Sequence, residues 1–471
     1  MANERRLWPM MVALVLAEMT CSFESNMIYS ALATLYRLFP DPAMVGWVIT
    51  AFLLTASGAA AVCARLGDIF GRRRMLLIML VVAGAGSLIS ALADGLAGVI
   101  LGRALQGASM VILPLCIGLV REQWPAHRVA MGIGILAGTY GLGSGLGLVV
   151  GGVIVDRGSW QGIFVCSAIF AVLSFVLVLI LVPRASAARS GRIERLDVWG
   201  GVLFVPAIAL VLLALTKVKD WGWAASATWL TLATGLTLMV VWVFHELRHS
   251  QPLIDVRLLS RRQIALANLL YFFQGFGPLM APMVIMPLLQ QPTWTLVGLG
   301  ATATFAGLVK VPANVLGVFT GPWAGHVAER RRDAGRRALL YGLVITLLPW
   351  GALIFYHGSI WFVAGCVIIS LPAMVATYTA TASLIVEAAP PERTSETTGL
   401  AQVVRSMGMA VGAQCIAFTL ATSTISDPGK GPGVYPSETA YTLVFGVIAA
   451  ACVVTLVLGL LLQRRPEQSA A

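Results

Sequence analysis

The sequence predicts an all-α integral membrane protein with about fourteen spans and both termini on one side of the membrane. Of its 471 residues, 58% are hydrophobic and only 11% are charged, whereas soluble domains carry about a quarter charged residues. Apolar runs of roughly 20 residues recur along the chain, and each is long enough to cross ~30 Å of hydrocarbon as a helix. The basic residues gather on alternate connections between these runs, as expected of a chain that crosses a membrane repeatedly.

Each apolar run is predicted to be a helix, because a helix satisfies its own backbone polar groups in lipid. The first run begins after Arg6 and is too long for the apolar core of a signal peptide, so we expect it to be a retained span. In chain order the predicted spans lie near residues 8–35, 44–64, 75–93, 97–120, 129–155, 160–182, 198–216, 224–245, 264–289, 296–324, 338–356, 360–386, 397–423 and 439–462.

The positions of Lys and Arg predict cytoplasmic termini in a cell inner membrane. Of the 32 basic residues, 24 fall on the side of the N-terminus and 5 on the opposite side. Cytoplasmic connections carry the excess of Lys and Arg in multi-pass proteins. The same asymmetry explains the net charge of +11 without a nucleic-acid partner.

Two basic connections divide the chain into three predicted parts. These are an N-terminal six-helix bundle (1–183), a linker with two extra helices (184–262) and a C-terminal six-helix bundle (263–471). A weak repeat relates the bundles, because span 2 ends with Asp68 and a Gly71-Arg72 turn, and span 10 ends with Glu329 and a similar turn. Parallel repeats place the binding site between two bundles. We expect such a protein to act as a monomer in the lipid bilayer.

Two motifs resemble signatures of the major facilitator superfamily. Residues 66–74 (LGDIFGRRR) resemble its loop between spans 2 and 3, and residues 101–107 (LGRALQG) resemble its motif in span 4. In the first motif we expect Asp68 to pair with an arginine across the cytoplasmic bundle interface, as a latch on the outward-facing state, while Gly71 permits a tight turn. The second motif places Arg103 inside the membrane.

Further segments are similar to the fourteen-spanner drug:proton antiporter family. Residues 23–33 (FESNMIYSALA) resemble its first-span motif, with Glu24 at the acidic position. In span 5, Gly143, Gly147 and Gly151 form a stripe in the place of its antiporter motif, but Leu148 stands where that family usually has proline. The resemblance implies exchange of protons for a small amphipathic compound, with no cofactor. Whether Leu148 abolishes antiport is left open.

Ionisable side chains inside the spans are the main functional candidates. Each costs a few kcal/mol or more in lipid unless it is paired or wet, so we expect most of them to surround a central cavity. Glu24 is the first candidate for carrying the proton, and Arg103 and Glu18 are further candidates for proton coupling. A fixed ion pair that holds helices together would also explain Glu24. The intramembrane charges are three positive and two negative, which weakly favours an anionic or zwitterionic substrate.

Other residues of the spans are candidates for the substrate cavity. Span 9 contains Gly275, Gly277 and Pro278, and a helix broken by such residues is tolerated where its backbone faces a cavity. The candidate cavity residues are Asn26, Tyr140, Tyr271, Gln274, Lys310, Asn314 and Arg405.

The sequence is also compatible with three alternatives to proton-coupled export of a small molecule. The first is proton-coupled uptake or exchange of an organic acid. The others are a non-transporting membrane sensor and a membrane-embedded enzyme. The chain lacks the Gly-Lys-Ser/Thr phosphate-binding loop of ATP-driven proteins, and its histidines and cysteines lack metal-ligand spacing. We therefore expect no enzymatic activity, no metal and no cofactor.

Overall fold

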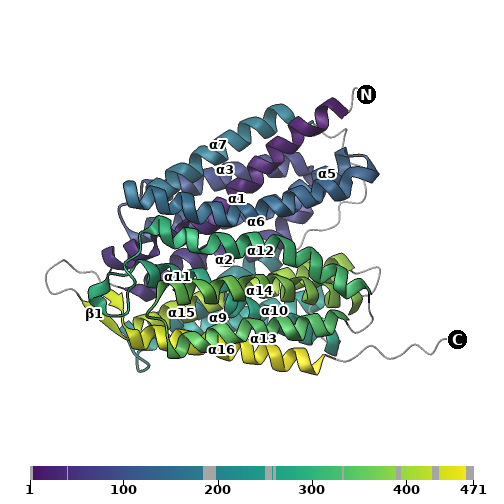
Figure 1. The fold of residues 1–471 in the computed structure, drawn as a ribbon. Helices are drawn as coiled ribbons and strands as arrows, with labels where there is room; N and C mark the ends of the chain where they lie inside the picture. The colour runs from purple at the N-terminus through teal and green to yellow at the C-terminus, as the bar shows by residue number, and fades with distance from the viewer. Residues whose placement is uncertain are drawn as a thin grey trace.

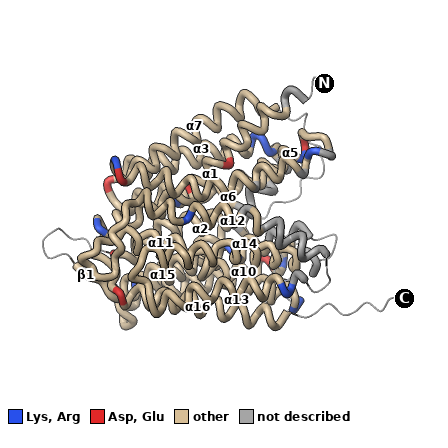
Figure 2. The backbone as a smooth tube through the Cα atoms, viewed as in Figure 1, with Lys and Arg blue, Asp and Glu red and all other residues tan. Residues whose placement is uncertain are grey.

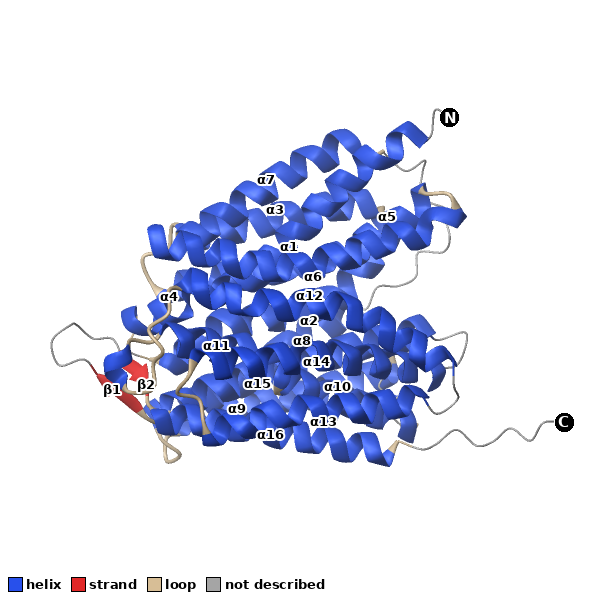
Figure 3. Ribbon diagram, viewed as in Figure 1, coloured by secondary structure: helices blue, strands red, loops and turns tan. Residues whose placement is uncertain are grey.

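A computed structural model of the chain describes residues 4–39, 41–183, 198–249, 257, 261–330, 334–388, 394–426 and 434–462. These residues are almost entirely helical (Figure 3). Helix α1 begins and α16 ends at the same end of the molecule (Figure 1), which we call the terminal face. The opposite end carries the β1–β2 hairpin, and we call it the hairpin face.

The N-terminal bundle is formed by the first helices of the chain. The segments α4, η1 and α5 follow one another directly and make a single span, Leu96–Gln123. In order the elements are α1 (Glu4–Leu38), α2 (Pro42–Phe70), α3 (Arg72–Ala91), α4 (Leu96–Gln106), η1 (Gly107–Val111), α5 (Ile112–Gln123), α6 (Ala126–Arg157) and α7 (Gly162–Leu181).

Two further helices, α8 (Val198–Trp221) and α9 (Ser226–Arg248), precede the C-terminal bundle. They pack on each other, and α8 also packs on α2. The C-terminal bundle consists of α10 (Arg262–Phe276), η3 (Pro278–Met280), α11 (Ala281–Gln290), η4 (Thr293–Thr295), α12 (Ala303–Arg330), α13 (Ala334–Phe355), α14 (Ile360–Ala388), α15 (Thr394–Ala421), the antiparallel strands β1 (Thr424–Ser426) and β2 (Val434–Pro436), and α16 (Glu438–Leu461).

The structure confirms a multi-pass, all-helical membrane protein. Among the described residues, twelve helical segments are long and apolar enough to cross a membrane. Helices α8 and α12, with 24 and 28 residues, are the two predicted spans outside that set. The charged residues of the described chain lie mainly at the two ends of the helices (Figure 2).

Two of the predicted spans contain breaks, and a third starts late. The predicted break in span 9 is present, because α10 ends before Gly277 and a 3-10 turn leads into α11. The 3-10 turn η1 in span 4 was not predicted. Span 10 was predicted to begin near residue 296, but α12 begins at Ala303. Before it the chain turns back on α11, with Leu296 at φ +67° and Gly300 at φ +66°.

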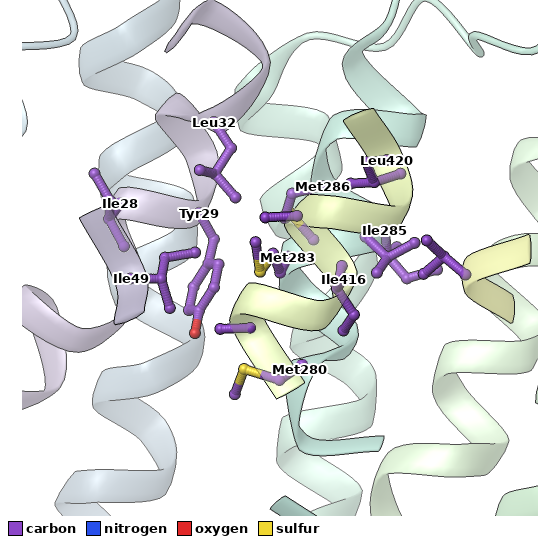
Figure 4. Close-up of a cluster of buried hydrophobic side chains, with 14 of the residues drawn as sticks. Ile28, Tyr29, Leu32, Ile49, Met280, Met283, Ile285, Met286, Ile416 and Leu420 are labelled. Atoms are coloured by element: carbon purple, nitrogen blue, oxygen red, sulfur yellow. The ribbon is translucent and has the colours of Figure 1, made fainter. Parts of the chain in front are cut away.

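The two bundles meet most closely in the half of the molecule next to the hairpin face. There α1 packs on α11, α2 on α15 and α6 on α12. Apolar side chains from both bundles fill this contact, including Leu32, Met283, Met286 and Leu420 (Figure 4). A small group of polar side chains also joins α2, α8 and α15. The Gln414 amide donates to Thr216 Oγ1 at 2.7 Å and accepts from Thr50 Oγ1 at 3.1 Å.

Candidate functional site

A cavity of about 590 Å³ lies between the two bundles, where the sequence repeat predicts the substrate site. Helices α1, α2, α4 and α6 line it from one side, and elements from α10 to α15 line it from the other. None of its lining residues comes from α8 or α9. The described part of the chain therefore forms the cavity from the two six-helix bundles alone.

Most of the predicted cavity residues line this space. Tyr271 does not line it, but it is buried and stacks on Tyr378, which does. Glu24 and Glu18 are also buried outside the lining. The predicted residues on the wall are Asn26, Arg103, Tyr140, Gln274, Lys310, Asn314 and Arg405.

Glu24 connects to the cavity through a chain of buried hydrogen bonds. Arg103 Nη1 donates to Gln106 Oε1 at 2.9 Å, and Gln106 Nε2 donates to Ser87 Oγ at 2.7 Å. The Ser87 hydroxyl in turn lies 2.9 Å from Glu24 Oε1. This sequence of contacts joins a cavity-lining guanidinium to a carboxyl group that the cavity does not reach directly.

The Ser87 hydroxyl has a single proton and two possible acceptors. Its oxygen lies 2.9 Å from both Glu24 Oε1 and the Ala83 carbonyl oxygen. An ionised Glu24 accepts the Ser87 proton, whereas a protonated Glu24 donates to Ser87 and leaves the hydroxyl to bond to Ala83. The network can therefore accommodate both protonation states of Glu24 without moving a heavy atom.

Arg103 is held by the backbone rather than by an ion pair. Its Nε donates to the Val48 carbonyl at 3.0 Å and its Nη1 to the Glu24 carbonyl at 2.7 Å. Its Cζ lies 4.2 Å from the centre of the Phe52 ring. Among the described residues no ion pair within 4.0 Å joins the Glu24 carboxylate to a cation, and Glu24 Oε2 has no hydrogen-bond partner.

Glu18 is a second buried carboxyl group on α1. It is fully buried, and neither of its carboxyl oxygens has a hydrogen-bond partner in the described part of the chain. An ionised carboxylate in such surroundings is costly. Glu18 therefore contrasts with Glu24, which has a hydrogen-bonded route to the cavity.

The hairpin side of the interface is tied by Asp156, at the end of α6. Its Oδ1 accepts from the Ala303 amide and its Oδ2 from the Thr304 amide, both at 2.8 Å. The first amides of a helix have no partner within the helix, and the helix dipole favours an anion there. One bundle thus caps a helix of the other, and sequence reasoning missed this residue.

Backbones of α6 and α12 approach closely beside this cap. A Cβ atom on Gly152 would lie 2.5 Å from the Ala303 carbonyl oxygen, and one on Gly307 would lie 2.7 Å from the Leu148 carbonyl oxygen. The predicted stripe faces elsewhere, because Cβ atoms on Gly143 and Gly151 would meet Ser22 and Met27 of α1. Gly147 likewise faces α1, near Phe23 and Asn26.

The predicted latch motif lies at the terminal face. Gly71 has φ +93°, which L side chains rarely adopt, and α3 begins directly after it. Arg72 Nη1 contacts the Gly118 carbonyl oxygen at 2.9 Å and Glu122 Oε1 at 3.1 Å. The side chains of Asp68 and Glu329 lie outside the described residues, so their latch role stays a prediction.

We expect Asp156→Asn to loosen the hairpin face. The substitution removes the charge at the α12 N-terminus and one of the two acceptors, which costs about 0.5–2 kcal/mol in this state alone. The ratio of the two access states should then change about two- to thirtyfold toward the state open at the hairpin face. Accessibility of a cysteine placed near Leu32 to an impermeant thiol reagent measures this, with Asp94→Asn, an exposed acid at the same face, as control.

The sequence matches one described protein family over most of its length. The family description of the Major Facilitator Superfamily matches residues 14–413. The tetracenomycin C resistance and export protein of Streptomyces glaucescens is 25% identical over 451 residues, which cover 92% of this chain and 81% of that protein. The probable actinorhodin transporter of Streptomyces coelicolor is 30% identical over 316 residues, covering 65% of this chain and 52% of that protein.

Solved structures share the fold. The nucleoside transporter NupG aligns with a TM-score of 0.67 and 12% identity, covering 95% of this chain and 99% of that chain. A peptide transporter called POT, in complex with sulfate, aligns with a TM-score of 0.67 and 17% identity, covering 96% of this chain and 93% of that chain. At these identities the likeness concerns the fold alone.

Proposed function

Because the chain belongs to the Major Facilitator Superfamily, we propose that it is a proton-coupled antiporter that exports a small amphipathic compound. The coarser part of this statement is established, since the chain is a multi-pass membrane transporter and not an enzyme, with drug-export relatives. The proposal adds fourteen spans, with α8 and α12 among them, cytoplasmic termini in an inner membrane, and action as a monomer. It keeps the bundle boundaries 1–183 and 263–471.

The observation that carries the proposal is a cavity between two bundles that are closed together at one end. The described hydrogen bonds between the bundles, from Asp156 to α12 and from Gln414 to α2, lie in the hairpin half. The cavity lining instead includes Gly134, Val375 and Thr379, in the terminal halves of α6 and α14. Such a geometry supports alternating access, in which the closed and open ends exchange.

Coupling to protons is proposed to run through Glu24. Its two protonation states change the direction of the Ser87 hydrogen bond, and Gln106 and Arg103 join the Ser87 hydroxyl to the cavity wall. A proton and a substrate that both bias one two-state equilibrium are coupled, whatever the distance between their sites. Loss of a proton from Glu24 and binding of substrate would then alternate through the transport cycle.

A second candidate function is proton-coupled uptake or exchange of an organic acid. The described lining of the cavity contains Arg103, Lys310 and Arg405 and no Asp or Glu, so an anion is favoured there whatever the transport direction. In the uptake of an organic acid, the proton would move in the same direction as the acid.

Reconstitution tests both readings. Liposomes that contain the purified protein and an internal pH-sensitive dye are given a pH gradient and then a candidate substrate. Antiport predicts that substrate moving in one direction drives protons in the other, and uptake with protons predicts movement in the same direction. Substrate movement with no proton movement in either direction would contradict the proposed coupling.

A further inference from the structure

The cavity wall on the side of the C-terminal bundle carries cations and aromatic rings without matching acids. From this we propose that the transported compound is an amphipathic aromatic anion, and that Lys310 and Arg405 bind its acidic group. The inference rests on the proposed function, in that it assigns the substrate class of the same cavity. It does not depend on the direction of transport.

The described residues that line the cavity carry a net positive charge. Arg103, Lys310 and Arg405 line the cavity, and among the described residues no carboxylate lines it. The two acids within the first span, Glu18 and Glu24, are buried on α1 and do not line the cavity. A cation entering the described cavity would meet three like charges, whereas an anion gains attraction from all three in a low-dielectric space.

The cations of the wall differ in the hydrogen bonds that they already make within the protein. The Arg103 guanidinium donates to two backbone carbonyls and to Gln106. Lys310 is 8% exposed, and its ammonium has no hydrogen bond or ion pair among the described residues. Buried ammonium groups without partners are costly, so Lys310 is the cation whose place in the wall is best explained by a ligand.

Arg405 is also incompletely satisfied. Its Nε is buried without a hydrogen-bond partner in the described part of the chain, and its Cζ lies 4.8 Å from the centre of the Tyr378 ring. A guanidinium that stacks on a ring leaves its planar edge of N–H donors free for a carboxylate or similar anion. Lys310 on α12 and Arg405 on α15 therefore offer donors from two helices of the same bundle.

Aromatic side chains form part of the cavity wall. Tyr378 stacks on Tyr271 with ring centres 5.3 Å apart, and Tyr140 and Trp350 also line the cavity. Ring stacking of this kind favours flat aromatic bodies over aliphatic chains. The apolar remainder of the lining, which includes Met110, Met374 and Met409, can adapt to such a body because methionine is flexible.

The test compares matched ligands on the full chain in lipid nanodiscs. Naphthalene, anthracene and phenanthrene are each used as the carboxylate, the primary carboxamide and the methylammonium compound, and binding is measured by the rise in melting temperature. We expect the carboxylates to stabilise the protein and the amides and ammonium compounds to do so at least about tenfold more weakly by dissociation constant. Ammonium compounds that bind as well as the carboxylates, or carboxylates that do not bind, would overturn the assignment.

Variants then locate the acidic group. Lys310→Gln and Arg405→Gln should each weaken carboxylate binding about tenfold or more, and Lys310→Arg should recover part of the loss. Lys217→Gln, which removes a lysine of α8 outside the cavity lining, should change nothing. Carboxylate affinity unchanged in both glutamine variants would contradict the assigned residues.

The melting temperature without ligand separates binding from a structural role. Lys310→Gln removes an unpartnered buried charge, so we expect the ligand-free protein to become more stable, as at other sites where function is kept at the expense of stability. A loss of stability would mean that Lys310 serves the fold.

Failure of this inference and failure of the proposed function give different results. Carboxylates that bind but move no protons would remove the proposed coupling and leave the substrate class intact. Ammonium compounds that drive proton movement would leave the coupling intact and remove the substrate class.

Discussion

Glu24→Gln is expected to abolish proton coupling while leaving substrate affinity within a few-fold of the wild type. Glutamine has nearly the shape of glutamate and can still accept the hydrogen bond from Ser87 that Glu24 Oε1 makes at 2.9 Å. It cannot gain or lose a proton, so the change of hydrogen-bond direction at Ser87 is lost. Because coupling requires a ligand to bias one state, a pH gradient should no longer drive substrate accumulation.

The measurement uses liposomes with an imposed pH gradient, and gradient-driven substrate accumulation should fall at least about tenfold, to the level without a gradient. Exchange of labelled for unlabelled substrate without a gradient should persist, which shows that the variant is folded. Glu18→Gln is the matched control on the same helix, because the described residues give Glu18 no hydrogen-bonded route to the cavity. Full coupling in Glu24→Gln, or equal loss in Glu18→Gln, would show that Glu24 does not carry the proton.

Gly152→Ala is expected to prevent full closure of the hairpin face. The added Cβ would lie 2.5 Å from the Ala303 carbonyl oxygen and 2.6 Å from its carbonyl carbon, both of which are backbone atoms at the start of α12. Overpacking of this kind costs typically about 1–3 kcal/mol, and the cost applies only while α6 and α12 are in contact. The population of the state described here should fall about fivefold to a hundredfold.

Transport by Gly152→Ala should fall by a similar factor, because each cycle must pass through the closed contact. Gly365→Ala on α14 is the matched control, since no atom lies within 4 Å of a Cβ built there. Wild-type transport in Gly152→Ala would mean that the α6–α12 contact is not part of the cycle.

The fold was predictable from the sequence because a bilayer leaves a chain few choices. Hydrophobic runs predict the membrane helices, and the break at Gly277-Pro278 follows from residues that interrupt a helix. The count of fourteen spans stays a prediction. The late start of α12 was missed because residues 296–302 are apolar and small and read as helix, although Gly298 and Gly300 allow the chain to turn. The β1–β2 hairpin has strands of three residues, too short to give an alternating pattern.

The charged residues of the site were predictable from the sequence, as were polar wall residues such as Asn26 and Gln274. Arg103, Lys310 and Arg405 stand out because cations are rare inside spans. Ser87 and Asp156 were missed for opposite reasons: a serine in an apolar helix is common, and an acid next to Arg157 at a span end looks like an ordinary solvated pair. Their roles depend on which helix lies opposite, and no periodicity within one helix carries that information.

The central claim is that the cavity opens to one end at a time. Double electron–electron resonance between spin labels tests it, with one pair at Ser159 and Leu296 on the hairpin face and another at Glu122 and Arg337 on the terminal face, all at positions exposed in the structure. When pH is changed or a naphthalene, anthracene or phenanthrene carboxylate is added, we predict that one distance grows while the other shrinks. Two distances that stay fixed, or that grow together, would contradict alternating access in this protein.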